Sequence, residues 1–291
     1  MSYGFILTTY NDADAAIKAY ESLKSTIPEG EYYKIVVVDG GSRPEEIRKL
    51  EQNIGWVIKD RKDLSEAINS GIYALLGYDP DGSNIKEFIE SGKSGCDYVF
   101  WLHSDQRFHQ NDWANKLIKI YEEYKGLIGK LGPATSCIDG SINSLNEGKV
   151  IGHSNQCPWV MDSDTIRLLI ENYGNVFNPK YVRCGGCEDH DLWFRLLSLG
   201  RYVLVCNLVD VVHLGMWNRG QRDTDKDQIY NRNVFHTIWG SDIYPKCDYN
   251  LAEMNAEILV KFGYLKQEVF DLISERDRLY KELLAMEKTA K

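Results

Sequence analysis

Residues 97–108, Asp-Tyr-Val-Phe-Trp-Leu-His-Ser-Asp-Gln-Arg-Phe, form the stretch on which the predicted fold depends. The run 98–102 is apolar throughout, which is typical of a strand buried on both faces of a sheet. It ends abruptly in His103, Ser104 and Asp105. Ligands of open α/β sheets bind beyond the carboxyl ends of the strands, where these polar residues fall. We therefore hypothesise a metal site that holds a nucleotide diphosphate, although the stretch by itself favours a plain polar turn.

Alternating strand and helix patterns precede this stretch. Residues 4–10, 33–39 and 56–58 are apolar or β-branched runs, and a helical spacing of apolar residues follows each of them. Such alternation predicts a parallel sheet with right-handed crossovers. We expect an α/β fold with a Rossmann-like mixed, mainly parallel sheet that is flanked by helices.

The pattern is less regular after the central stretch. In chain order we expect a helix that starts near residue 111, a strand at 131–134, a Gly/Ser/Asn-rich loop at 137–155, a helix after residue 164, a helix at 188–199 and a long strand at 202–212. The polar run 218–227 that follows is typical of a mobile flap. Asp162-Ser-Asp164 repeats the Asp-x-Asp pattern, but it directly precedes a helical stripe, so we interpret it as a helix cap.

The charge, the cysteine spacing and the apolar runs of the chain argue against several classes of function. The chain has 291 residues and a net charge of -9, which argues against general binding to nucleic acid or to an anionic membrane. Seven cysteines without framework spacing indicate a reducing compartment, and the single C-x-x-C at 184–187 lacks a second pair for structural zinc. No secretory signal and no apolar run of about 18 residues is present, so we expect a soluble cytoplasmic protein.

The chain changes character near residue 240. From residue 250 onward, apolar residues recur every three or four positions with charges between them, which predicts one or two amphipathic helices. We expect a catalytic domain at 1–240 and a C-terminal helical region at 241–291. The helices either pack back on the domain or pair between subunits, and pairing would make a homo-oligomer.

Further polar residues follow the other strands. Thr8, Thr9 and Tyr10 end the first strand, and His213 ends the last. Asp39 ends the second strand, where it either binds a ribose or base or caps the turn 40–42. His213 becomes a plausible third ligand beside an Asp105 site, because a strand fixes the ring of a metal-bound histidine.

Glu188 and Asp189 open a predicted helix. The helix dipole favours their ionised forms, and an ionised carboxylate that faces a substrate hydroxyl can act as a general base. Acids are also common at helix starts for structural reasons. The preceding pair Gly185-Gly186 favours the functional interpretation, because it lets the backbone approach a ligand closely.

The order of these segments resembles the family 2 glycosyltransferases over about residues 3 to 215. The resemblance is carried by Thr-Thr-Tyr at 8–10, Val-Val-Val-Asp-Gly-Gly-Ser at 36–42, Leu-Ser-Glu-Ala-Ile-Asn-Ser-Gly at 64–71, Leu-His-Ser-Asp at 102–105, Glu-Asp-His-Asp-Leu-Trp-Phe-Arg at 188–195 and His213. It implies the glycosyltransferase A-type fold, a nucleotide-sugar donor and a hydroxyl acceptor whose identity the sequence leaves open.

The resemblance also implies residue roles. Tyr10 and Asp39 would lie near the base and ribose, and Asp63, or a residue close to it, near the uracil or diphosphate. Asp105 would be the metal-binding acid of Asp-x-Asp and His213 a further metal ligand. The Glu188-Asp189 pair would supply the base that deprotonates the acceptor, with Asp189 favoured.

The chain departs from the family pattern at His103, where the first Asp of Asp-x-Asp is expected. A nitrogen donor at this position shifts the preferred ion from Mg²⁺ toward Mn²⁺. Two alternatives stay open, a retaining enzyme of the same fold and a non-catalytic nucleotide-sugar-binding protein, whereas the sequence disfavours a third, a nucleotidylyltransferase. The last would need a Gly-rich loop with Arg and Lys after the first strand, and Thr8-Thr-Tyr-Asn11 lacks it.

Overall fold

The computed structural model describes residues 2–59, 61, 63–78, 95–126, 128–133, 136–137, 149–151, 158–183, 186–206, 209, 211–214 and 225–240. The strands are β1 (Tyr3–Thr9), β2 (Tyr33–Asp39), β3 (Val57–Ile58), β4 (Tyr98–His103), β5 (Gln106–Phe108), β6 (Ile128–Pro133), β7 (Ser136–Cys137), β8 (Lys149–Ile151), β9 (Trp159–Asp162), β10 (Tyr202–Cys206) and β11 (Val211–His213). The helices are α1 (Ala13–Thr26), α2 (Pro44–Ile54), α3 (Leu64–Leu76), α5 (Trp113–Glu123), α6 (Ser163–Tyr173), α7 (Glu188–Ser198) and α9 (Asp225–Trp239).

The described strands form one large and one small sheet. The large sheet has eight strands in the order β3-β2-β1-β4-β9-β6-β10-β8, and β5, β11 and β7 make the small one. Strands β1 to β4 pair in parallel, whereas β9 is antiparallel to both β4 and β6. The predicted mixed, mainly parallel α/β sheet is therefore confirmed.

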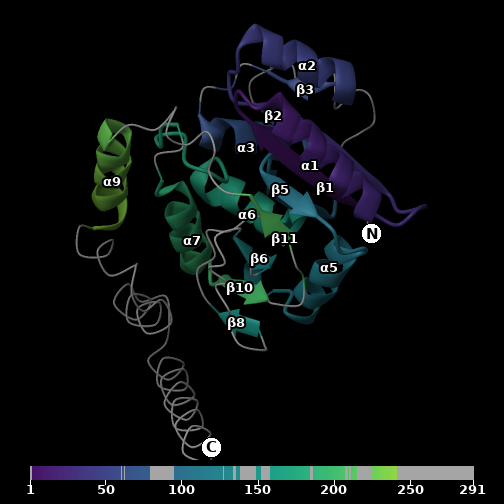
Figure 1. Ribbon diagram of the computed structural model, residues 1–291. Coiled ribbons are helices and arrows are strands. Elements are labelled where there is room, and N and C mark those ends of the chain that lie inside the picture. Colours follow the sequence, from purple (N-terminus) through teal and green to yellow (C-terminus); the bar gives the residue numbers. More distant parts are fainter. Residues whose placement is uncertain are drawn as a thin grey trace, which may run out of the picture.

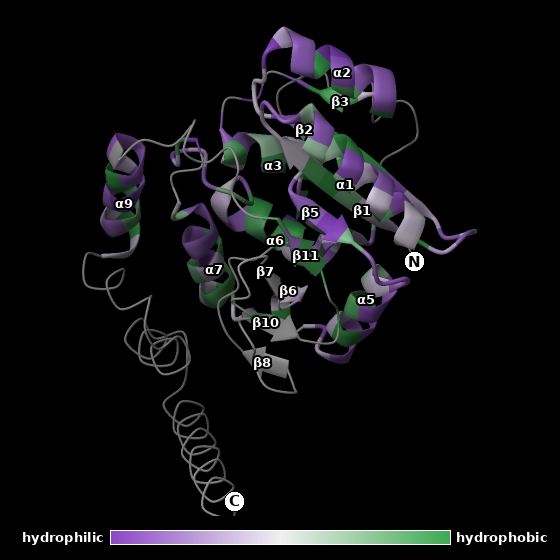
Figure 2. Ribbon diagram, in the orientation of Figure 1, coloured by the Kyte–Doolittle hydropathy of each residue, from purple (hydrophilic) through white to green (hydrophobic). Residues whose placement is uncertain are grey.

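Helices cover both faces of the large sheet. On one face α3, α6 and α7 pack against alternate side chains such as Ile6 and Val36, and on the other α1 and α5 pack against Phe5 and Val37. Both faces carry apolar side chains because successive residues of a strand point to opposite faces, and these strands are apolar at nearly every position. Figure 1 shows α1 and α2 on one side of the strands, and Figure 2 shows their outward surfaces to be largely hydrophilic.

Several sequence predictions need correction. The predicted long strand at 202–212 is wrong: its residues divide between β10 in the large sheet and β11 in the small one. Strands β7 and β8 fall within or beside the predicted loop 137–155, and neither β5 nor β9 was expected. These strands are two to four residues long, too short for an alternating pattern to identify them. The predicted cap at Asp162 is confirmed, since its Oδ1 accepts a 2.8 Å hydrogen bond from Thr165 N.

Two further predictions concern the C-terminal part of the chain. The predicted flap at 218–227 is wrong for its last residues, because α9 begins at Asp225, and 215–224 lie outside the described residues. The predicted helical region 241–291 also lies outside them. No helix in the described ranges combines the length and the apolarity needed to cross a bilayer.

Close packing of α3 on β1 gives a testable prediction about stability. A Cβ atom on Gly71 would lie 2.5 Å from Ile6 Cγ2, which is fully buried. Gly71→Ala should therefore lower the free energy of unfolding by about 1–3 kcal/mol, the usual cost of overpacking. Urea denaturation followed by circular dichroism measures it, and an unchanged midpoint would contradict the packing described for α3.

Candidate metal and nucleotide site

The pairing of β5 with β11 brings two distant segments together. Strand β4 ends at His103, the chain turns through Ser104 and Asp105, and β5 then runs antiparallel to β11 with Gln106 opposite His213. A 2.9 Å hydrogen bond from Leu214 N to Asp105 O extends this pairing. The side chain of Gln106 is fully buried and accepts a 3.0 Å hydrogen bond from His103 N, which holds the turn closed.

This arrangement places His103, Asp105 and His213 in one cluster. One ligand atom from each residue lies within 4.8 Å of the others. The Oδ1 atom of Asp105 and Nε2 of His213 are 3.0 Å apart, and the two side chains are only 15% and 22% exposed. Both atoms are buried, and neither makes a well-aligned hydrogen bond within the described residues. The two imidazole rings are nearly perpendicular, at 89°.

The protonation of Asp105 suits a metal ligand. Burial acts to raise the pKa of its carboxyl, but the contact with His213 and the charge of His103 lower it more, so the pKa lies below its usual value. The carboxylate is therefore ionised at neutral pH, as metal binding requires.

The donor set and spacing fit a divalent cation. Two ligands at right angles with bonds of about 2.1 Å lie about 3.0 Å apart, which is the observed separation of Asp105 Oδ1 and His213 Nε2. One carboxylate oxygen and two imidazole nitrogens suit Mn²⁺ better than Mg²⁺, which prefers oxygen ligands. The same contact also has the form of a plain buried ion pair, and the mutations described below distinguish the two.

Asp39 caps the turn after β2, as one of the two interpretations of the sequence predicts, and its other role stays a prediction. Its Oδ2 accepts hydrogen bonds from Gly41 N at 2.8 Å and Ser42 N at 2.9 Å, so it caps the turn after β2. Gly41 has φ +88, a conformation that favours glycine. The Oδ1 atom of Asp39 is fully buried and has no hydrogen-bond partner among the described residues. An unmatched buried acceptor is costly, which makes it a candidate to accept an N–H or O–H group of a ligand.

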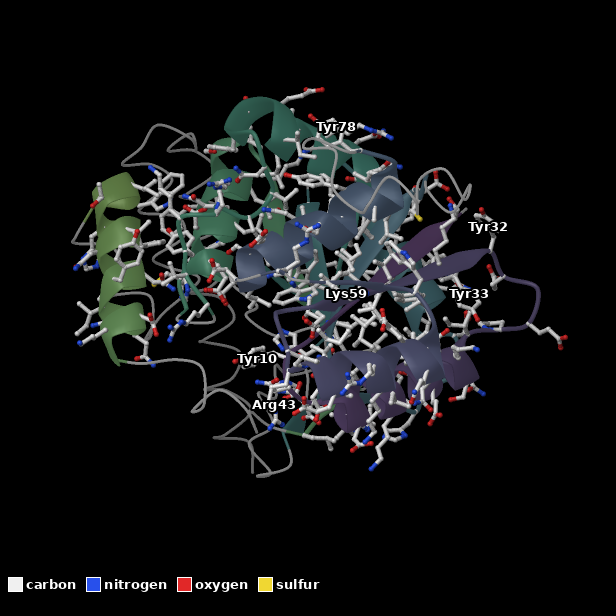
Figure 3. The ribbon with its side chains drawn as sticks, turned by 90° about the horizontal axis from the view of Figure 1, so that it is seen from above. Tyr10, Tyr32, Tyr33, Arg43, Lys59 and Tyr78 are labelled. Carbon is white, nitrogen blue, oxygen red and sulfur yellow. The ribbon has the colours of Figure 1, made fainter. Side chains whose placement is uncertain are left out.

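The two threonines that end β1 make hydrogen bonds within the fold, whereas Tyr10 after them is partly exposed. The hydroxyl of Thr8 donates to Leu102 O and accepts a 3.1 Å bond from Trp101 Nε1, and the Thr9 hydroxyl donates to Asp12 O. Both hydroxyls therefore brace β4 and the start of α1. Tyr10 is half-buried and lies with Arg43 at the carboxyl end of the strands, opposite Tyr32 and Tyr33 (Figure 3).

Asp63 contacts the loop that leads to α7. It precedes α3 without capping it, and its Oδ1 accepts a 2.6 Å hydrogen bond from Arg183 N. Leu64 N donates in turn to Arg183 O at 3.2 Å. The backbone N–H of Arg61 donates to Asp39 O at 3.3 Å. Asp39, Asp63 and the loop before α7 thus lie at the same edge of the sheet.

Glu188 and Asp189 form the first turn of α7, as predicted. Glu188 is buried, and Asp189 Oδ1 accepts a 2.9 Å bond from His190 N and lies 3.1 Å from His190 Nδ1. One turn further, Arg195 Nε lies 2.6 Å from Asp191 Oδ2, and Trp239 Nε1 donates to Asp191 Oδ1 at 2.8 Å. Burial raises the pKa of Asp191, an effect that Arg195 opposes.

Two tryptophans that could stack on a sugar have another role. The sequence offers Trp159, Trp193 and Trp217 as candidates for stacking on a sugar face, with core packing favoured for Trp193. Trp159 and Trp193 are 1% and 2% exposed and pack in the core with α3, α6 and α7, so the stacking role is wrong for Trp159 and core packing is confirmed for Trp193. Trp217, the third candidate, lies outside the described residues, as do Cys184 and Gly185.

Sequence reasoning missed Gln106 and Asn231. The side chain of Gln106 binds the backbone of His103, and that of Asn231 binds the backbone of the loop before α7. Asn231 was missed because α9 was not expected, although the apolar residues 234, 235, 238 and 239 recur at helical spacing and could have indicated a helix.

Comparison with solved structures identifies the fold. Neither a family model nor a curated protein matches the chain by sequence. The structure of GalNAc-T7 with UDP, GalNAc and Mn²⁺ matches with a TM-score of 0.61 and 12% identity, over 93% of this chain and 56% of that one. S. aureus TarS 1–349 matches with a TM-score of 0.55 and 13% identity, over 89% of this chain and 71% of that one. Full S. aureus TarS gives 0.56 and 13%, over 90% of this chain and 43% of that one. The chain has the glycosyltransferase A-type fold that the sequence predicted.

The cluster predicts a specific loss of metal binding. His213→Ala should weaken Mn²⁺ binding by at least about 10-fold, since it removes one of three protein ligands. His109→Ala is the matched control, because His109 is exposed and four residues beyond Asp105. Isothermal titration of Mn²⁺ in the presence of UDP measures both variants. Equal affinities for the two would show that Asp105 and His213 form only an ion pair.

Proposed function

We propose that this chain is a metal-dependent glycosyltransferase that moves a sugar from a UDP-sugar to an acceptor hydroxyl with inversion. The observation that carries the proposal is the His103, Asp105 and His213 cluster at the carboxyl edge of a sheet of this fold. UDP and Mn²⁺ are present in the GalNAc-T7 structure that the chain resembles, which supports the choice of donor and ion.

Different residues would bind the ion, the nucleoside and the diphosphate of the donor. His103, Asp105 and His213 would hold the ion, which as a Lewis acid offsets the charge that develops on the departing diphosphate. The buried Oδ1 of Asp39 would accept an N–H of the base or an O–H of the ribose, and Tyr10 would flank them. Ser104 lies in the turn between two of the metal ligands, next to the expected position of the diphosphate. Thr8 and Thr9 would act indirectly, by fixing β4 and the start of α1.

Proton transfer is assigned to Asp189. The acceptor oxygen forms a bond to the anomeric carbon as the bond from that carbon to the diphosphate oxygen breaks. The acceptor proton passes to the carboxylate of Asp189, which lies in the first turn of α7. Glu188 is more deeply buried and would support the turn. Inversion follows from attack on the face opposite the leaving group.

Donor hydrolysis tests the metal-bound donor site without knowledge of the acceptor. The protein should slowly release UDP from a UDP-sugar with Mn²⁺ present, and Asp105→Ala should abolish this release. Asp164→Ala is the matched control, because Asp164 belongs to the other Asp-x-Asp and its side chain is 72% exposed. If no UDP-sugar with any divalent ion is hydrolysed, while UDP and Mn²⁺ still bind, the chain is a binding protein and not an enzyme.

The role of Asp189 predicts a separation of binding from turnover. Asp189→Asn should lower kcat by about 10²–10⁴-fold, the usual contribution of a general base. The affinity for UDP with Mn²⁺ should stay within about twofold of wild type, because Asp39 and the metal ligands are untouched. Stopped assays of UDP release and calorimetry measure the two quantities. Full activity of the variant, or a product with retained anomeric configuration by NMR, would contradict this role.

A further inference from the structure

The loop before α7 is held in an unfavourable backbone conformation. Arg183 has φ 53 and Cys187 has φ 75, and both are left-handed positions that non-glycine residues adopt at a cost. Such conformations persist only where surrounding contacts enforce them. The loop leads directly into Glu188 and Asp189, so whatever fixes it also fixes the first turn of α7.

The side chain of Asn231 on α9 supplies these contacts from one side. Its Oδ1 accepts a 2.9 Å hydrogen bond from Val182 N, and its Nδ2 donates to Val182 O at 3.0 Å and to Gly186 O at 3.1 Å. Asn231 is fully buried. One amide therefore binds the backbone of Val182 and Gly186, the neighbours of the two left-handed residues Arg183 and Cys187, just before the proposed base.

Other side chains on the same face of α9 contact α7 directly. Phe235, one turn after Asn231, is fully buried and meets Phe194 edge to face at 5.5 Å and His190 at 6.2 Å. Another turn on, Trp239 donates to Asp191. Figure 1 shows α9 lying along the outer side of α7. From the opposite side, Asp63 and Leu64 bind the backbone of Arg183.

We propose that Asn231 is a positioning residue that sets the location of the Asp189 carboxylate relative to the acceptor. The inference rests on the proposed function. Without the amide, the backbone of Val182 and Gly186 loses three hydrogen bonds and the loop relaxes from its left-handed conformation. A displacement of about 1 Å at a reacting group costs on the order of 10²-fold in rate. Within the described residues, the hydrogen bonds of Asn231 go to Val182 and Gly186, and none goes to Asp39 or to the three residues of the metal cluster.

The kinetic test compares two asparagines of one helix. Asn231→Ala should lower the kcat of UDP release from UDP-glucose, UDP-galactose or UDP-N-acetylglucosamine by about 10- to 100-fold. The KM for the donor should stay within about twofold of wild type. Asn233→Ala removes the same side chain from an exposed position two residues away and should leave both constants unchanged. The kcat is expressed per UDP-binding site, so that a loss of folded protein does not imitate the effect.

Hydrogen–deuterium exchange tests the inference independently of activity. Peptides that cover 182–191 should exchange faster in Asn231→Ala than in Asn233→Ala, and those that cover 98–108 should not differ. If Asn231→Ala fails to fold, Asn231→Ser retains a neutral hydroxyl that can accept from Val182 N or donate to a carbonyl, and it should show a smaller effect in the same direction. Equal kcat or equal exchange for the 231 and 233 variants overturns the inference. A wild-type protein that releases no UDP counts against the proposed function, and the exchange comparison still decides the role of Asn231.

Discussion

The antiparallel pairing of β5 with β11 is the constraint on which the candidate site depends. Three residues of each strand carry it, and they place Asp105 beside His213 across 108 positions of sequence. The buried amide of Gln106 closes the turn from His103 to Asp105 against the same pair of strands. Because β5 belongs to the small sheet and β4 to the large one, the ligands lie where the two sheets meet.

The two halves of the site are attached to the fold by different means. The proposed metal and nucleotide side is built from strand ends, with Asp39 and His103 fixed by the parallel register of β1, β2 and β4. The side that carries Asp189 depends on a loop, and this loop is held by the Asp63 side chain, by the backbone N–H of Leu64 and by the side chain of Asn231 in α9. A substitution that loosens the loop should therefore affect proton transfer more than donor binding.

The sequence predicted the parts of the structure whose signal is local. The apolar runs of β1, β2 and β4 identified the sheet, and the polar residues at their ends identified Asp39, His103 and Asp105 as neighbours. His213 was proposed as a ligand because it ends an apolar run, and the resemblance agreed, but the run gave no sign that β10 and β11 separate. Asn231 could not be assigned, since its partners are backbone atoms 45 and 49 residues away. Long-range hydrogen bonds to a loop leave no periodic pattern in the chain.

The central claim is that His103, Asp105 and His213 hold one cation beneath a nucleotide diphosphate. A crystal grown with UDP and MnCl₂, with diffraction recorded near the manganese absorption edge, tests it most directly. The account predicts an anomalous peak about 2.0–2.3 Å from Asp105 Oδ1 and His213 Nε2 and in contact with the diphosphate oxygens. A peak elsewhere, with Asp105 and His213 hydrogen-bonded to each other and UDP bound without the metal, would contradict the account.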